Sequence, residues 1–350
     1  MLPAYEIFKN EIEQIEKYMQ SIEFYNQIVT LDVSKSRAIY KDKIINLQKC
    51  NDGFYKRKYD YAIVIISLYG GFEQFVENFI RDYLMILIGE YKEYSKLPEL
   101  IRNKHFDLSV LLLGKIDQPK YSGIISKEQI IRNLNECIQN NKCALNYEAF
   151  CQHTANFRSQ VVGEVLGNIG LSKILNNIKR NEALKLLYIQ ENGECSYDNL
   201  ELDKVFSFLS DLANRRNQIA HGAIEDILSY ELQKQMIEKV KLFVCEMDKI
   251  GFEMVLCYLI NKSYKIERIY NPNKKTKLLC FNFTGKEISI GDIIIKKNND
   301  KFTYCRIKSI EINRVQYEKY ETQEDVDVGA MLDTNRKEGE EYWIYSVISS

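Results

Sequence analysis

The sequence is poor in proline, histidine and tryptophan, with four, three and one of these residues among 350. Proline breaks the interior of a helix because it has no amide hydrogen to donate, so its scarcity favours long helices. Long apolar runs are also missing. One of the most apolar, 61–72, has 12 residues, whereas a helix that spans a membrane needs about 20. We therefore expect buried helices and no contact with a membrane.

The sequence also has no excess of charge of either sign. It contains 48 basic and 49 acidic residues, for a formal net charge of -1. An indiscriminate nucleic-acid binder carries a broad basic field, so a nucleic-acid partner would here be held by local basic patches. The nine cysteines include no Cys-x-x-Cys pair of the kind that binds zinc. The N-terminus lacks the basic region and apolar core of a signal peptide. We therefore expect reduced cysteines, a cytoplasmic location, no metal and no cofactor.

Apolar residues recur at helical spacing through residues 1–265. In the stretch 59–87, Ile63, Ile66 and Val76 follow one another in steps that place them on one side, which predicts a central helix covered by its neighbours. The segment 96–142 is less regular and predicts short helices and loops. The remaining predicted helices cover 6–28, 35–48, 160–175, 181–188, 203–220 and 227–260.

The pattern changes near the end of the chain. The polar stretch 263–277 predicts a linker, and from residue 278 onward apolar and polar residues alternate as in half-buried strands. The predicted strands cover 278–283, 293–297, 303–312, 326–332 and 342–348. Several short strands in about 75 residues suit a small closed β-barrel. The predicted fold is therefore mainly α, with a helical bundle over residues 1–265 followed by a small β-barrel over 266–350.

One helical segment groups residues that are suited to catalysis. At about 100° per residue, Arg216, Asn217, Ala220 and His221 fill one contiguous arc of the predicted helix. Ile219 points the other way, toward the core. Gly222 follows at once and leaves room for another backbone to approach. The sequence thus predicts a cation, an amide and an imidazole on one open face.

That set of groups suits cleavage of an RNA phosphodiester. Histidine exchanges protons near neutral pH, so it can deprotonate the 2′-hydroxyl or protonate the leaving oxygen. The arginine fork binds the negative charge that collects on the phosphate in the transition state. The nucleophile belongs to the substrate, and no carboxylate cluster suited to a metal is evident. The alternative is structural, because Arg216 and His221 near a helix C-terminus also complement the helix dipole.

The run Arg215-Arg216-Asn217-Gln218-Ile219-Ala220-His221-Gly222 resembles the signature of the HEPN superfamily, whose ribonucleases share an Arg-x(4–6)-His motif with a polar residue after the arginine. Arg216, Asn217 and His221 match it. Arg215 also satisfies the spacing, so the functional arginine remains open between the two. The run from Leu68 through Tyr69 to Phe75 resembles a helix of the MAE-like HEPN group, and 154–158 with 170–171 resembles a further segment of that group less closely.

The resemblance implies a helical bundle that forms a homodimer with its motif helices face to face. The two Arg–His pairs would make one composite active site for metal-independent cleavage, which leaves a 2′,3′-cyclic phosphate and a 5′-hydroxyl. Members of the superfamily often act as toxins or anti-phage effectors that cut tRNA or other RNA. The alternative is a non-catalytic dimer that binds RNA or protein, or an antitoxin-like partner. An antitoxin or sensor protein encoded nearby is a further expected partner.

Three other positions near these motifs are candidates for supporting roles. We expect Glu73 to pair with Arg216 or Arg215, because an unpaired carboxylate on an apolar helix is costly; the alternative is a partly exposed acid. Tyr69 belongs to the same helix. His153 could line the cleft, although a capping or surface role is the favoured interpretation. His105 has no functional argument from sequence.

The C-terminal segment resembles the second-domain β-barrel of translational GTPases, on the runs that begin at Gly285, Arg306 and Asp327. This resemblance implies a barrel that could position a tRNA-like substrate. A local basic patch would comprise Lys274, Lys275, Lys277, Lys296, Lys297 and Lys301. The alternative is a solvated lysine-rich surface, because acidic residues are as frequent in this segment.

Overall fold

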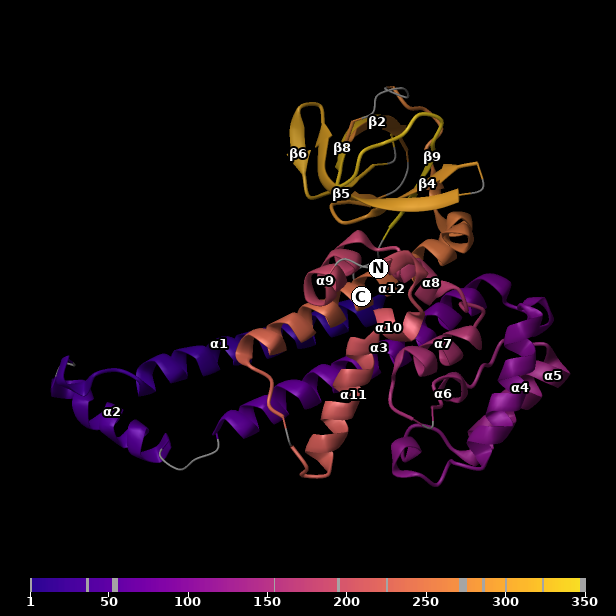
Figure 1. The fold of residues 1–350 in the computed structure, drawn as a ribbon. Helices are drawn as coiled ribbons and strands as arrows, with labels where there is room; N and C mark the ends of the chain where they lie inside the picture. Colours follow the sequence, from indigo (N-terminus) through magenta and orange to yellow (C-terminus); the bar gives the residue numbers. More distant parts are fainter. Residues whose placement is uncertain are drawn as a thin grey trace. The chain divides into compact units, whose positions relative to one another are not determined.

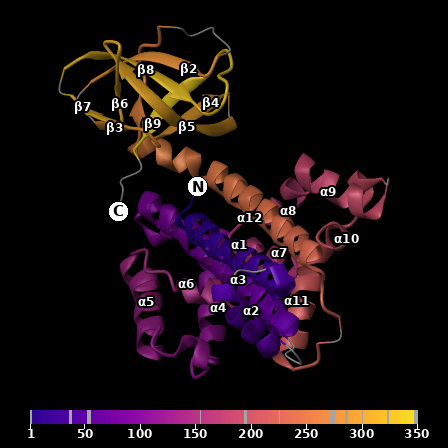
Figure 2. The same ribbon diagram turned by 90° about the vertical axis from the view of Figure 1, so that its left-hand side faces the viewer.

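The structure is a computed structural model, and it describes residues 2–35, 38–51, 56–153, 155–193, 196–224, 226–270, 276–284, 287–299, 301–322 and 324–346. The chain forms two compact units, Met1–Ile250 and Gly251–Ser350. The first is built of helices and the second of a curled sheet (Figures 1 and 2). The predicted fold class, mainly α with a small β region at the end, is therefore confirmed. The units divide within the last long helix, whereas the sequence suggested a boundary after residue 265.

Three long helices form the centre of the first unit. Helix α1 (Pro3–Val29) begins with a proline, whose missing amide costs nothing in the first turn. It packs against α3 (Lys56–Tyr91), where the rings of Phe8 and Phe75 lie 5.7 Å apart. Helix α12 (Tyr230–Leu259) completes the group, and α2 (Ala38–Asn51) follows α1. These helices agree with the predicted stretches and extend them by a few residues at several of their ends.

Helix α3 is the core helix, with fourteen buried residues. By length and composition it is apolar enough to cross a membrane, but those are also the properties of a core helix, and this one is covered by its neighbours. The predicted buried face was wrong in part. Ile63 and Ile66 are exposed, while Val64, Ile65 and Leu68 are buried. The run 61–72 is apolar on nearly every side, so its periodicity alone does not identify the face that meets the core.

Shorter helices surround this centre: α4 (Glu99–Leu113), α5 (Lys127–Asn140), α6 (Tyr147–Phe150), α7 (Ser159–Gly167), α8 (Ile174–Ile178), α9 (Glu182–Asn192), α10 (Leu202–Val205) and α11 (Ser207–Ala220). Short 3-10 turns cover Val33–Lys35, Tyr94–Lys96, Pro119–Tyr121, Tyr197–Asn199 and Ile260–Lys262. The predicted helix at 203–220 is two helices, separated at Phe206.

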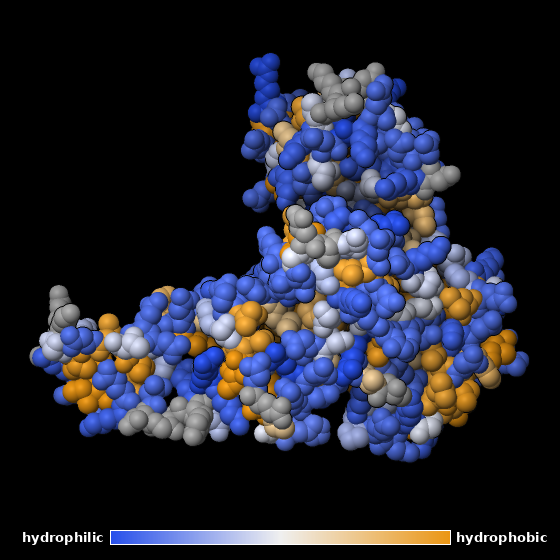
Figure 3. Space-filling view, in the orientation of Figure 1, coloured by the Kyte–Doolittle hydropathy of each residue, from blue (hydrophilic) through white to orange (hydrophobic). Residues whose placement is uncertain are grey.

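The segment 96–142 contains two ordinary helices, α4 and α5, where the sequence predicted only short ones. Its prolines lie at helix starts rather than inside helices: Pro98 caps α4 and Pro119 begins a 3-10 turn. Large apolar side chains are exposed over these two helices, visible as an orange area on the right of Figure 3. They include Phe106, Leu111 and Ile131. This pair therefore leaves part of its apolar surface uncovered.

The second unit is antiparallel throughout its described strands. Its main sheet has the strand order β1-β9-β4-β5-β8-β2, with β6 beside β5, and a separate pair joins β3 and β7. The strands are β1 (Tyr264–Lys265), β2 (Leu278–Phe283), β3 (Glu287–Ser289), β4 (Ile293–Asn298), β5 (Lys301–Ile312), β6 (Val315–Tyr317), β7 (Lys319–Glu321), β8 (Val326–Leu332) and β9 (Glu341–Tyr345).

The sheet curls around its own core like a half-barrel, and its two edges approach each other. Four residues after the end of β1, Ile269 forms an isolated antiparallel bridge with Phe281 of β2. The core under the sheet includes Phe281, Phe283, Ile294 and Ile310. The predicted strands at 278–283 and 326–332 have the bounds of β2 and β8. Strands of two or three residues were not predicted, and β1 lies inside the predicted linker.

Candidate active site

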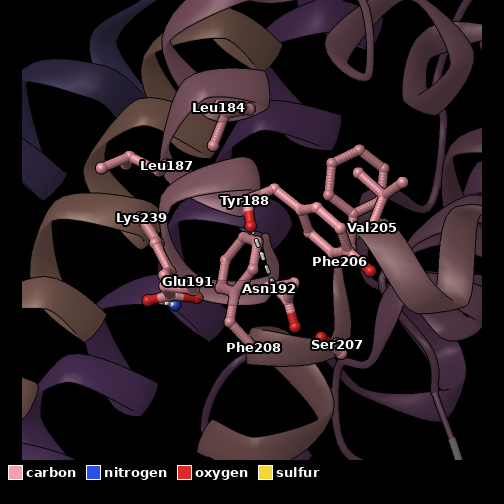
Figure 4. Close-up of a pocket in the computed structure, with 10 residues that line it drawn as sticks. All are labelled: Leu184, Leu187, Tyr188, Glu191, Asn192, Val205, Phe206, Ser207, Phe208 and Lys239. Atoms are coloured by element: carbon pink, nitrogen blue, oxygen red, sulfur yellow. Dashed lines mark hydrogen bonds and ion pairs between the residues drawn. The ribbon is translucent and has the colours of Figure 1, made fainter. Parts of the chain in front are cut away.

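Aromatic packing fixes the start of the motif helix α11. The Phe206 and Phe208 rings lie 5.2 and 6.2 Å from the ring of Phe243 on α12. Figure 4 shows Phe206 and Phe208 with Tyr188 of α9 around a small pocket beside this helix start. The pocket volume is about 30 Å³, room for a few water molecules at most. It is too small for a nucleotide, so this end of α11 anchors the helix.

The other end of α11 stops at a glycine. Gly222 has φ 71°, a conformation that side chains with a Cβ rarely adopt. The Gly222 amide donates to the Ile219 carbonyl and the Ala223 amide to the Gln218 carbonyl, at 3.0 and 2.9 Å. These bonds are those of a Schellman motif. His221 is consequently the C-cap residue, and its side chain is exposed just beyond the last turn.

Arg216 lies on Tyr69 of α3. Its guanidinium carbon is 5.5 Å from the centre of the Tyr69 ring, a cation–π contact. One guanidinium nitrogen donates to Asn217 Oδ1 at 3.3 Å, and the guanidinium makes no salt bridge with any described acid. Burial and the nearby Glu73 carboxylate raise the pKa of Tyr69 to about 12, so the ring stays neutral beneath the cation. The arginine thus keeps an unneutralised charge and free donors.

Arg215 lies on a different face of α11, and its guanidinium already has several hydrogen-bond partners. Its Nε donates to Asp211 Oδ2 at 2.8 Å, and one terminal nitrogen donates to the Tyr61 hydroxyl at 2.9 Å. The same nitrogen donates to the Asp226 carbonyl at 3.2 Å, and the side chain is only 13% exposed. Binding a phosphate through this guanidinium would require breaking those bonds. The geometry therefore favours Arg216 over Arg215 as the arginine that meets a ligand.

The segment 155–158 contacts α11 and α3 through three hydrogen bonds. Asn156 Nδ2 donates to Asn217 Oδ1 at 2.7 Å. The Phe157 amide donates to the Tyr69 hydroxyl at 3.0 Å, and Arg158 donates to Asn214 Oδ1 at 2.6 Å. Asn217 and His221 are one turn apart, where the His221 amide donates to the Asn217 carbonyl at 3.0 Å. One short segment thus contacts both Asn217 and the tyrosine beneath Arg216.

A model of the family described as RiboL-PSP-HEPN matches residues 9–250, more than half of the chain. The chain belongs to this HEPN family. The superfamily predicted from the motif is thereby confirmed, and the matching group is RiboL-PSP-HEPN, where the local resemblance had suggested the MAE-like group. Neither a curated protein nor a solved structure matches the chain. Membership supports a ribonuclease or RNA-related role. The match ends before the sheet unit, so the likeness to translational GTPases stays a prediction.

Glu73 of the HEPN unit pairs with a histidine and not with an arginine, so that prediction was wrong. His153 Nε2 lies 3.2 Å from Glu73 Oε1 and 3.4 Å from Glu77 Oε1. Lys120 Nζ lies 2.6 Å from Glu77 Oε1 and 3.1 Å from His153 Nε2. The favoured capping or surface role of His153 was also wrong, because its side chain is 10% exposed and its ring centre is 4.2 Å from that of Phe157.

Charge is balanced within this cluster of Glu73, Glu77, His153 and Lys120. Burial acts against a charged imidazole, but hydrogen bonds to the two glutamates outweigh it and raise the pKa of His153 to about 9. Burial likewise opposes a charged Glu77, yet its bonds to His153 and Lys120 lower its pKa overall. Ligand atoms of the two glutamates and the histidine lie within 4.8 Å of one another, a spacing that could hold a metal. The ammonium of Lys120 already occupies that space and neutralises the second carboxylate.

The lysines predicted to form a basic patch differ in their exposure. Lys274 and Lys275 lie outside the described residues. Lys277 is exposed, and Lys297 lies over the Phe302 ring at 5.6 Å. Lys296 is 6% exposed and donates to Thr334 Oγ1, so it does not belong to a surface patch. The alternation of the strand points Lys296 inward, where its stem packs and its ammonium finds a hydroxyl.

The sequence contains little indication that Asn156 and Lys120 would take part in these contacts. Asn156 entered only through a loose family resemblance, and Lys120 not at all. The i, i+4 spacing of Glu73 and Glu77 puts both carboxylates on one face of α3, which indicates a shared cationic partner. That partner comes from distant loops, so its identity depends on the fold. His105, in contrast, is fully buried between Tyr94 and the Asn146 amide and is structural.

Proposed function

We propose that this protein is a metal-independent endoribonuclease of the HEPN type. The observation that supports this most strongly is the face formed by Arg216, Asn217 and His221 at the free end of α11. Arg216 is held by the Tyr69 ring and is not neutralised by a described acid. His221 is exposed one turn beyond Asn217. On this face, the arginine can bind a phosphate and the histidine can exchange protons with the substrate.

In the proposed reaction the 2′-hydroxyl oxygen attacks the adjacent phosphorus, and the bond from phosphorus to the 5′-oxygen breaks. One imidazole removes the 2′-hydroxyl proton, and a second group donates a proton to the leaving 5′-oxygen. The products are a 2′,3′-cyclic phosphate and a 5′-hydroxyl, and no water is consumed. The Arg216 guanidinium and the Asn217 amide would bind the non-bridging oxygens, where negative charge increases in the transition state.

We further propose that the active form is a homodimer. Two protons are exchanged at opposite sides of the phosphorus, and each chain offers one histidine on this face. Two motif helices face to face would supply both imidazoles and both guanidinium groups to one cleft. Ala220 is exposed and no atom lies within 4 Å of a Cβ built at Gly222, so the end of α11 has room for a second chain.

The biological role that fits best is a cytoplasmic toxin or anti-phage effector that cuts tRNA or other cellular RNA, regulated by an antitoxin or sensor protein. The sheet unit would bind RNA away from the cut, with exposed Lys277 and half-buried Lys297 among its cations. This part rests on family membership and on the resemblance of the sheet unit to translation-factor barrels. The alternative is a dimer that binds RNA or protein without cutting it.

The test is end-mapping of total RNA incubated with purified wild-type protein, Arg216→Ala, Asn217→Ala and His221→Ala. We expect wild type to produce cyclic-phosphate ends in the presence of EDTA, and loss of one proton-transfer group to slow cleavage by about 10²- to 10⁴-fold. Sedimentation should show dimers for every variant. Equal cleavage by wild type and His221→Ala would overturn the proposal. RNA binding without cleavage by wild type would support the non-catalytic alternative.

A further inference from the structure

The orientation of the Asn217 amide is fixed by two donors that meet at one atom. Asn217 Oδ1 accepts from Asn156 Nδ2 at 2.7 Å and from Arg216 at 3.3 Å. A guanidinium has only donors, so a reversed amide would place a nitrogen donor against another donor. Arg216 therefore determines which atom of Asn217 is the oxygen, and the same argument makes the Asn156 atom that faces it a nitrogen.

The other half of the Asn217 amide is its Nδ2 group. With Oδ1 held by two donors, Nδ2 of Asn217 is directed away from Asn156 and Arg216. Among the described residues it has no hydrogen-bond partner. Asn217 is half-buried and lies one turn before the exposed His221. A free donor with a fixed direction, beside a guanidinium and an imidazole, suits a non-bridging phosphate oxygen.

We propose that Asn156 is a positioning residue for RNA cleavage, which holds the Asn217 amide so that its Nδ2 donates to the scissile phosphate. The inference rests on the proposed function and assigns Asn156 a role that acts through Asn217. The effect of Asn156 should be largest in the transition state. The Asn217 Nδ2 donor that it holds is already aligned, so no reorganisation is needed when negative charge develops on the phosphate.

The segment that contains Asn156 is anchored without it. Phe157 is fully buried and its amide donates to the Tyr69 hydroxyl. Its ring lies against His153, which the two glutamates hold in turn. On the other side, Arg158 donates to Asn214 of α11. Removing the Asn156 side chain should therefore leave the segment in place and leave the Asn217 amide held only by the longer bond from Arg216, at 3.3 Å.

A double-mutant cycle tests this inference with Asn156→Ala, Asn217→Ala and the double variant, assayed on a short RNA that contains a cleavage site mapped from total RNA. We expect Asn156→Ala to lower kcat by about 10- to 100-fold with KM nearly unchanged, since it weakens a contact that matters most in the transition state. The double variant should cleave as slowly as Asn217→Ala and no slower. Asn156→Asp should be at least as slow as Asn156→Ala, because a carboxylate only accepts and favours the reversed amide.

Arg158→Ala is the matched control, because its side chain joins the same segment to the same helix at Asn214 and does not hydrogen-bond to Arg216, Asn217 or His221. It should cleave within about twofold of wild type, as expected for an exposed contact. A phosphorothioate at the scissile position supplies a second readout. Sulfur replaces the oxygen that receives the Asn217 donor, so its effect on kcat should be large in wild type and small in both Asn156→Ala and Asn217→Ala.

The outcomes separate this inference from the proposed function. Additive losses in the cycle, an unchanged kcat for Asn156→Ala, or an equal loss for Arg158→Ala would overturn the positioning role while cleavage by wild type stands. A thio effect that stays large in Asn156→Ala would also overturn it. Failure of wild type and His221→Ala alike to cleave any RNA would instead overturn the proposed function, and this inference with it.

Discussion

The two faces of helix α11 differ although they are built from consecutive arginines. Arg215 is surrounded by partners: the Asp211 carboxylate, the Tyr61 hydroxyl and the Asp226 carbonyl. Arg216 lies on the Tyr69 ring and shares one hydrogen bond with Asn217. A tyrosine of α3 meets each arginine, but Tyr61 uses its hydroxyl and Tyr69 its ring. One face is saturated and joins helices together, while the other keeps charge and donors free for a ligand.

The identity of a residue and its position in a motif therefore do not determine its role. Both arginines satisfy the Arg-x(4–6)-His spacing, and about 100° of rotation around the helix separates them. A hydroxyl and a carboxylate satisfy the donors of a guanidinium. An aromatic ring holds the cation without using its donors. The tyrosines and acids around the helix therefore assign a structural role to one arginine and leave the other available.

The largest expected effect separates the two arginines by activity. Arg216→Lys keeps the charge but loses the planar fork, so cleavage should fall by about 10²- to 10³-fold. Arg215→Lys should change kcat by less than about fivefold, because its partners do not contact the substrate. Rates of cleavage of a mapped RNA by the two purified variants measure this directly. Similar losses in both would remove the distinction between the faces.

The second prediction reverses the order for stability. Arg215→Ala removes a guanidinium that is 13% exposed, and leaves the buried Tyr61 hydroxyl and the half-exposed Asp211 carboxylate without their shared donor. It should lower the free energy of unfolding by about 2–3 kcal/mol. Arg216→Ala loses a cation–π contact and should cost about 1 kcal/mol or less. Urea unfolding followed by circular dichroism gives both values. An Arg216→Ala variant that is the less stable of the two would contradict the assignment.

The third prediction concerns pH and compares two histidines of the helical unit: His153, which two glutamates contact, and His105, which is buried beside Tyr94. The pKa of His153 is raised from 6.5 to about 9, so its protonated form contributes stability that is complete below pH 6.5 and lost as the pH rises to 9. Burial lowers the pKa of His105 to about 4, so its neutral form contributes stability above pH 6.5 that is lost as the pH falls toward 4. Each contribution is at most about 3 kcal/mol.

Thermal unfolding between pH 4 and 10 measures these two contributions. In His153→Gln the decline between pH 6.5 and 9 should disappear while the decline at acid pH remains. In His105→Gln the acid decline should shrink and the alkaline one should persist. Identical profiles for wild type and His153→Gln would show that His153 is not held protonated by Glu73 and Glu77.

The sequence allowed good prediction where one helix or strand carried the whole signal. The alternation in β2 and β8 predicted their bounds. The spacing of Arg216, Asn217 and His221 predicted one shared face of a helix, and the structure ends that helix at Ala220. Prediction failed where a partner is distant. Glu73 was assigned to an arginine because the motif helix supplied two of them, whereas His153 lies in a loop whose path depends on tertiary packing.

Very short strands and the choice between Arg215 and Arg216 could not be predicted from the sequence. Strands of two or three residues such as β1 have too few positions for alternation to appear. The choice between Arg215 and Arg216 depends on whether a hydroxyl or a ring of α3 lies beneath each one, and the sequence contains a tyrosine at both places. The register of α3 against α11 decides it.

The smallest expected effects come from Tyr61 and Tyr69, the two tyrosines of α3 that contact Arg215 and Arg216. Tyr61→Phe removes the hydroxyl that Arg215 uses and should cost about 1 kcal/mol in unfolding free energy with no change in cleavage. Tyr69→Phe keeps the ring beneath Arg216 but leaves the Phe157 amide without an acceptor, at a cost of about 1–3 kcal/mol. Because that amide belongs to the segment with Asn156, kcat should also fall a few-fold. Urea unfolding and cleavage rates of the two variants would show it, and a loss of activity in Tyr61→Phe alone would place the catalytic arginine on the other face.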